Sequence, residues 1–251
     1  MARMLAFMLL AASLCGFAQD YERERRWERE IVPGLVVGEP LKLRAAGREF
    51  LALHTEAANS KGAVVLAHGR NVHPDHEVIG ALRMRLADMG FTTLSIQMPI
   101  LGPEATKMED YYPRLFPEAA ERLDAAGRWL QERGERRVAL VSHSMGSWMA
   151  NEYFDAADAS PYRAWVCMGL TGGYSWRSYR SARPILDVYG ENDNSTVTGA
   201  AWRRRLTIAV APQGSRQVEI PGADHFYTGR DAELAKVIAE WLEGVLASAT
   251  P

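Results

Sequence analysis

Three residues whose types together carry out nucleophilic catalysis each follow a strand-like apolar run in this chain: Ser144, Asp193 and His225. A serine hydroxyl becomes a strong nucleophile when an imidazole removes its proton, and a carboxylate holds that imidazole in the right orientation. In open α/β sheets, functional sites form outside the carboxyl ends of the strands. We therefore expect the three side chains to meet at one edge of a sheet as a Ser-His-Asp triad.

The segment around Ser144 has the pattern of a sharp turn from a strand into a helix. Its sequence is VALVSHSMG over residues 138–146, and a helical pattern follows. Ser142 and Gly146, two residues before and two after Ser144, are small enough for such a turn. The N–H of Met145 would lie at a helix N-terminus, where it can stabilise an oxyanion. The alternative is that Ser144 caps an ordinary helix.

The same segment resembles the nucleophile elbow, G-x-S-x-G, of the α/β-hydrolase superfamily, although Ser142 replaces the first glycine. The superfamily places its acid after a later strand and its histidine before the last helix. Here the run ILDVYGEND ends at Asp193, and the run IPGADHFY contains His225. Asp187 lies inside the strand and is interpreted as structural, and Glu191 is the reserve acid.

A second segment, LAHGRN, directly follows a buried apolar run. The resemblance implies that this loop supplies the second N–H of the oxyanion hole. Arg70 is the expected donor and Asn71 the alternate, and Gly69 would let the backbone approach the substrate closely. His68 is expected to be a structural hydrogen-bonding residue rather than a base. Each of these two segments also contains a histidine, His68 and His143, that we expect tentatively to line the substrate pocket.

A narrower resemblance rests on the run HGRNVHPD, the pair Ile79-Gly80 and the run FTTLSIQMP. Together they are similar to a small family of exported bacterial α/β-hydrolase-like proteins of unassigned function. The similarity extends from about residue 35 to the C-terminus. It implies the fold and the site, and it implies no substrate.

The elements that must position these residues alternate between apolar runs and amphipathic stretches. Runs such as AVVLA are apolar throughout, which is typical of strands buried on both faces of a parallel sheet. Short turns between the first strands indicate an antiparallel start. We expect an α/β-hydrolase fold with a mostly parallel twisted sheet, helices on both faces and no large cap domain. Strands are expected at 35–37, 41–43, 50–54, 63–67, 92–97, 138–142, 164–168, 185–189 and 215–220, and helices at 78–89, 118–133, 145–157, 200–209 and 231–246.

Two long irregular pieces, residues 98–117 and 170–183, lie between these elements. Loops of that length in a compact domain are usually functional or disordered. The second piece contains Tyr174 and Trp176, which would either line a substrate pocket or pack on the surface. The stretch 164–193 is too short for a large cap, so an open pocket for substrates of modest size is expected.

The first 18 residues have the pattern of a secretory signal peptide. Arg3 gives a positive start, residues 4–14 form an uncharged and mostly apolar run, and Gly16 and Ala18 are small residues before a possible cut. The alternative is an N-terminal anchor helix. A periplasmic or secreted protein is the expectation.

The chain is therefore expected to consist of a leader (1–18), a charged arm (19–33) and one hydrolase domain (34–251). The arm would be a short solvated helix or a mobile segment. Cys15 would leave with the leader. Cys167 lies in an apolar run and is expected to be a buried, inert thiol.

The composition excludes several classes of partner. Hydrophobic residues make up 47% and charged residues 24%, which is ordinary for a soluble globular protein. Lys and Arg number 29 against 31 for Asp and Glu, so the chain has no field to hold nucleic acid. The arginine run at 203–205 is interpreted as a solvated helix face. His73, Asp75 and His76 do not match a zinc signature, and no phosphate-binding glycine motif occurs, so neither a metal nor a cofactor is expected.

The function that these residues support is an exported serine hydrolase of a small ester-like molecule, with a carboxylic ester as the expected bond. A thioesterase, an amidase or a hydrolase of a cell-envelope component would use the same triad. A non-catalytic binding protein on a hydrolase scaffold is the alternative of another class, and Ser142 in place of glycine favours it. The sequence leaves the oligomeric state open, and no membrane span is expected after the leader.

Overall fold

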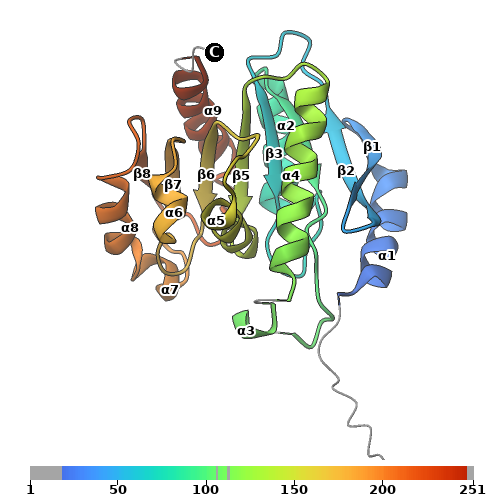
Figure 1. The fold of residues 1–251 in the computed structure, drawn as a ribbon, viewed down its shortest axis with the longest axis horizontal. Coiled ribbons are helices and arrows are strands. Elements are labelled where there is room, and N and C mark those ends of the chain that lie inside the picture. The colour runs from blue at the N-terminus through green and yellow to red at the C-terminus, as the bar shows by residue number, and fades with distance from the viewer. Residues whose placement is uncertain (1–18, 106, 112–113, 248–251) are drawn as a thin grey trace, which may run out of the picture.

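A computed structural model describes residues 19–105, 107–111 and 114–247. The expected leader, residues 1–18 with Cys15, lies outside the described residues. Within the described part, one central sheet is covered by helices on both faces (Figure 1). No described helix is both long and apolar enough to cross a membrane.

Eight strands of the described chain form this sheet, in the order β1-β2-β4-β3-β5-β6-β7-β8. The pairs β1–β2 and β2–β4 are antiparallel, and the remaining neighbours are parallel. This confirms the mostly parallel sheet with an antiparallel start. The strands are β1 (Glu39–Ala45), β2 (Arg48–Thr55), β3 (Ala63–Ala67), β4 (Thr92–Ile96), β5 (Val138–His143), β6 (Ala164–Met168), β7 (Ile185–Gly190) and β8 (Arg216–Ile220).

Two helical layers enclose the sheet because its central strands are apolar on both faces. Every residue of β3, β4, β5 and β6 is buried, whereas β8 at the edge keeps exposed residues. One layer is formed by α4 (Phe116–Glu132), α5 (Met145–Ala156), α6 (Trp176–Arg180) and α8 (Ala201–Ile208), and the other by α2 (Glu77–Asp88) and α9 (Asp231–Ala247) (Figure 1). Two separate apolar cores result, one on each side of the sheet.

The elements differ from the sequence-based expectation in two respects. Residues 35–37 form no strand: the short 3₁₀ turn η1 (Val32–Gly34) precedes them, and Val36 is almost fully exposed. A short apolar run forms a strand only if a neighbouring strand pairs with it. Here the pairing with β2 begins at Glu39, after this run. In addition, the expected irregular pieces contain the short helices α3 (Met108–Tyr111) and α6, and α7 (Ser195–Thr198) follows Asp193.

The charged arm forms a docked helix, α1 (Tyr21–Ile31), whose N-terminus is capped by the Asp20 carboxylate. Its outer face is solvated, but Glu24 on the inner face is 8% exposed. The Glu24 carboxylate accepts a hydrogen bond from Arg122 of α4 at 3.0 Å, and Arg122 is itself buried. The arm therefore forms the expected short helix, but its inner face is not solvated, because a partner almost a hundred residues away neutralises Glu24 there.

The arginine run on α8 needs a similar correction. Arg203 and Arg205 are exposed, as a solvated helix face requires, whereas Arg204 is fully buried. The Nε of Arg204 donates to Asp187 at 3.0 Å, and its Nη1 donates to the carbonyl of Leu170 at 2.7 Å. This ion pair agrees with the structural role expected of Asp187.

Candidate active site

The turn between β5 and α5 holds Ser144 in a strained backbone conformation. Its φ is 55° and its ψ is −116°, a region that residues with a Cβ atom rarely adopt. Gly146 allows the turn to close, because a Cβ atom there would lie 2.5 Å from the carbonyl oxygen of His68. The serine hydroxyl is thereby presented at the carboxyl end of β5, and the backbone is not that of an ordinary N-cap, which usually lies in the extended region.

Ser142, which stands where the superfamily pattern has glycine, is fully buried and hydrogen-bonded. Its Oγ accepts a hydrogen bond from the indole Nε1 of Trp165 at 2.8 Å. The same Oγ lies 3.1 Å from the hydroxyl of Ser147 and 3.3 Å from the carbonyl of Val166. The serine side chain is therefore accommodated beside Trp165, in the core between the sheet and the layer of α4 and α5.

Ser144, His225 and Asp193 come together in one hydrogen-bonded chain. The Nε2 of His225 lies 2.9 Å from the Oγ of Ser144, and its Nδ1 lies 2.6 Å from Oδ1 of Asp193. A carboxylate only accepts, so Nδ1 carries the proton and Nε2 is free to accept the serine proton. The imidazole side chain of His225 is 16% exposed, whereas the carboxylate of Asp193 is buried. The acid end of this hydrogen-bonded triad is therefore shielded from solvent.

Two further features fix this carboxylate and imidazole. Oδ1 of Asp193 also accepts the backbone N–H of Asn194 at 2.6 Å, while its Oδ2 is buried with no hydrogen-bond partner among the described residues. Gly169, at the end of β6, has a φ of 62°, and a Cβ atom there would lie 3.0 Å from the ring of His225. The reserve acid Glu191 is used elsewhere: its carboxylate accepts the N–H of Gly222.

A cavity of about 410 Å³ opens in front of the serine hydroxyl. The predicted oxyanion residues Gly69, Arg70 and Met145 line it, and so does His143. Asn71 does not line it, and its Oδ1 accepts hydrogen bonds from Tyr111 and Arg23. Residues that the sequence analysis did not single out complete the lining: Val72, Trp148, Gly169, Thr171, Asn194 and Phe226.

His143 lies directly behind the imidazole of His225. The two ring centroids are 4.9 Å apart, and the Nε2–H of His143 donates to the carbonyl of His225 at 2.8 Å. Burial, together with the nearby His225, lowers the pKa of His143 to about 4. His143 is therefore neutral near pH 7 and holds the backbone of the histidine loop.

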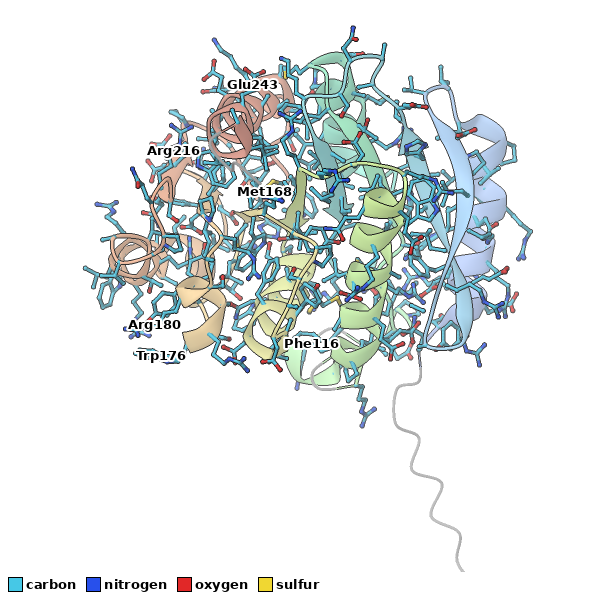
Figure 2. The ribbon with its side chains drawn as sticks, turned by 45° about the horizontal axis from the view of Figure 1, so that its top comes forward. Phe116, Met168, Trp176, Arg180, Arg216 and Glu243 are labelled. Carbon is cyan, nitrogen blue, oxygen red and sulfur yellow. The ribbon has the colours of Figure 1, made fainter. Side chains whose placement is uncertain are left out.

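Three tentative pocket residues lie outside this cavity. His68 is buried at the end of β3, where its Nε2 accepts the N–H of Met98 at 2.9 Å, and burial lowers its pKa to about 3. Tyr174 points into the core and donates to Asp187 at 2.8 Å. Trp176 is 63% exposed on α6, where Arg180 stacks on its ring (Figure 2). Aromatic type alone did not distinguish a core or surface position from a pocket position.

The loop after β3, at residues 69–72, is held by α1. The guanidinium of Arg23 donates to Oδ1 of Asn71 at 3.2 Å and to the carbonyl of Leu101 at 3.3 Å. Asn71 has a φ of 58°, so this loop residue is also in the left-handed region. Trp27 of the same helix makes an edge contact with His73 at 5.6 Å.

The remaining sequence candidates have other partners. Asp75 pairs with Arg83 at 2.6 Å, while the rings of His73 and His76 lie 5.2 Å apart. Among the described residues, no three His, Cys, Asp or Glu side chains are grouped as a metal site requires. Cys167 is buried in β6, and burial raises the pKa of its thiol, as expected of an inert cysteine.

Comparisons with known proteins agree with this architecture. The family model described as "Protein of unknown function (DUF3530)" matches residues 21–114, which include α1 and the loop after β3. No curated protein matches the chain.

Several solved structures are similar over nearly their whole length. XC6422 from Xanthomonas campestris, described as an α/β serine hydrolase without lid, has a TM-score of 0.65 at 17% identity, covering 86% of this chain and 98% of that one. An α/β serine hydrolase homologue from Coxiella burnetii has a TM-score of 0.63 at 16% identity, with 82% and 98% covered. Est1E from Butyrivibrio proteoclasticus has a TM-score of 0.62 at 14% identity, with 83% and 99% covered. Together with the strand order and the serine turn, these similarities identify the fold of this chain as that of the α/β hydrolases.

Proposed function

We propose that this chain is a serine hydrolase that cleaves carboxylic esters of modest size. The observation that carries the proposal is the hydrogen-bonded chain from Ser144 through His225 to Asp193, with distances of 2.9 Å and 2.6 Å. It sits at the carboxyl edge of the sheet, on a serine whose backbone is strained, and such strain clusters at functional sites. The fold shared with several serine hydrolases and esterases supports the same reaction class.

In the proposed mechanism, Nε2 of His225 takes the proton of Ser144 as the hydroxyl attacks the ester carbonyl. Asp193 keeps Nδ1 protonated and stabilises the imidazolium that forms. The N–H groups of Met145 and Arg70 stabilise the negative oxygen of the tetrahedral intermediate. His225 then donates the proton to the departing alcohol. Water then attacks the acyl-enzyme while His225 takes its proton. His225 returns that proton to the Oγ of Ser144 as the carboxylic acid leaves.

The lining of the cavity supports an acyl group with an aromatic or flat apolar part. Trp148 and Phe226 present ring surfaces, while Thr171 and Asn194 add polar groups. The indole of Trp148 is fixed because its Nε1 donates to Thr171 at 2.8 Å. One of the similar solved structures is Est1E with bound ferulic acid, an aromatic acid. We therefore place aromatic esters first in a substrate panel, followed by short aliphatic esters, thioesters and amides.

The test is active-site labelling with a fluorophosphonate probe, which modifies only an activated serine. The wild-type protein should be labelled, and Ser144→Ala should not. His225→Gln should label at least a hundredfold more slowly, because the base is removed. Equal labelling of wild type and Ser144→Ala, or no labelling of a folded wild-type protein, would leave the non-catalytic binding protein as the better explanation.

Two features weaken that alternative. The serine at position 142, which favoured it, has its own buried partner in Trp165 and leaves the turn able to close. The catalytic side chains are also complete and mutually hydrogen-bonded.

Export is a separate part of the proposal and rests on the leader pattern of residues 1–18. Cell fractionation with N-terminal sequencing of the recovered protein tests it. A mature protein that begins at Gln19 would support a cleaved signal peptide. A membrane-bound protein that still begins at Met1 would support the anchor helix instead.

A further inference from the structure

A second cavity, of about 930 Å³, lies at the opposite end of the sheet from Ser144. Its lining residues stand just before or at the start of β6, β7 and β8, and the last turns of α9 close one side. In Figure 1 the C-terminal end of α9 is at the top, whereas α7, beside Asp193, is at the bottom. The proposed triad therefore makes no use of this cavity.

The cavity is lined by an excess of positive charge. Arg163, Arg183 and Arg216 line it, and Glu240 is the one acidic residue among its lining residues. The carboxylate of Glu240 is exposed and lies 3.8 Å from Lys236 on its own helix. Figure 2 shows Arg216 near α9 at the edge of the molecule. Because the chain as a whole is nearly neutral, this excess is a local feature.

Arg183 carries the strongest indication of a missing partner. Its side chain is partly buried, with the guanidinium over the ring of Phe154 at 4.0 Å and Nη1 donating to Ser181 at 2.8 Å. Its Nε is buried and has no hydrogen-bond partner within the described ranges. Burial without a neighbouring carboxylate lowers the pKa of Arg183 to about 10. Holding a cation in this way is costly unless an anion joins it.

The other two arginines also lack an acidic partner among the residues that the structure describes. Arg163 is exposed, and its Nε donates to the carbonyl of Arg136 at 2.8 Å, so this bond leaves its charge without a carboxylate among the described residues. Arg216 is exposed and forms no ion pair within the part of the chain that the structure describes. Three guanidinium groups thus line one cavity, and no carboxylate within the described ranges is bound to any of them.

We propose that this cavity binds a phosphate group carried by a small organic molecule or by a lipid headgroup. A guanidinium presents two parallel N–H groups that match the oxygens of phosphate, and such charge-assisted pairs are among the strongest hydrogen bonds in proteins. A volume of about 930 Å³ lies at the upper end of the range for ligand sites and leaves room for more than the phosphate itself.

Isothermal titration of the full chain with pyrophosphate, at constant ionic strength, tests the proposal. Wild type should show saturable binding of one pyrophosphate per chain. Arg183→Gln and Arg216→Gln should each weaken the affinity by about tenfold or more, because each removes a charged donor. Arg203→Gln is the matched control: it removes an equally exposed arginine that does not line the cavity, and its affinity should equal that of wild type.

A second arm distinguishes the two sources of the phosphate group. Flotation with phosphatidylglycerol vesicles, compared with phosphatidylcholine vesicles, detects a lipid headgroup, and glycerol 3-phosphate in the titration detects a soluble ester. Flotation with phosphatidylglycerol vesicles, or saturable binding of glycerol 3-phosphate, supports the site if it is lost in Arg216→Gln. Absence of saturable binding in both arms, or an equal loss in Arg203→Gln, would overturn it. Labelling of Ser144 stays intact in all of these variants, so this outcome is independent of the proposed hydrolase activity.

Discussion

Replacing Ser142 by alanine should lower the stability of the protein and leave catalysis unchanged. The substitution removes the acceptor of the Trp165 indole N–H, and both residues are completely buried, so no water can take its place. A buried donor left without a partner costs about 1–3 kcal/mol. For a domain of this size that corresponds to a melting temperature lower by roughly 4–8 °C at the middle of the range. Ser142→Gly should cost slightly more, since glycine in a strand adds about 0.5–1 kcal/mol.

Urea unfolding followed by tryptophan fluorescence measures the stability, and hydrolysis of the best ester from the substrate panel measures kcat. Ser147→Ala is the matched control. Its hydroxyl donates to the carbonyl of Met168 at 2.9 Å, and that carbonyl keeps the N–H of Ser144 as a second donor. The control should therefore cost less than Ser142→Ala. An unaltered unfolding free energy in Ser142→Ala, or a tenfold loss of kcat at unaltered stability, would refute the reasoning.

Three other predictions follow from the geometry around the site. Gly146→Ala should abolish labelling of the active serine and destabilise the fold by several kcal/mol, because its Cβ would lie 2.5 Å from a backbone oxygen; a folded, labelled variant would contradict this. Arg23→Met should lower kcat about tenfold with little change in KM, because the loop that carries the proposed oxyanion donor loses its contact to Asn71. Arg23→Lys should restore part of the rate, and equal rates in all three proteins would exclude a positioning role. In the folded protein the pKa values of His68 and His143 are lowered from 6.5 to about 3 and about 4. As the pH falls below 6.5, these two histidines therefore take up protons in the unfolded chain before they do so in the folded protein. The free energy of unfolding should then fall on acidification towards pH 4, by up to about 1.4 kcal/mol per pH unit for each histidine, and His68→Gln should make that fall shallower in urea titrations.

The sheet was predictable because its central strands are apolar on both faces. AVVLA became β3 with the same bounds that its composition predicted, and the helix after the serine turn began at Met145 as expected. The edges of the sheet were harder, since an edge strand is only half buried and a run such as residues 35–37 differs from one only in lacking a partner strand.

The residues proposed for catalysis could be singled out because each is tied to the end of a strand, where the order of the elements restricts its position. The cavity walls are different. Trp148 lies one helical turn after Ser144, and Phe226 adjoins His225, so their spacing held a signal. Tyr174 and Trp176 had only their aromatic type to suggest a pocket, and one packs in the core while the other lies at the surface. Long-range partners, such as the residue that pairs with Glu24, have no local pattern at all.

The pairing of Glu24 with Arg122 also constrains the order in which the protein can fold. The two residues are 98 positions apart, so a chain that emerges N-terminus first exposes the acid long before its partner exists. At ordinary rates of synthesis this interval is on the order of 5–20 s. During that time α1 has no site to dock on, and its dense charges keep it hydrated and unlikely to aggregate. We therefore expect α1 to join the domain only after α4 has formed, and to fix the loop at residues 69–72 late in folding.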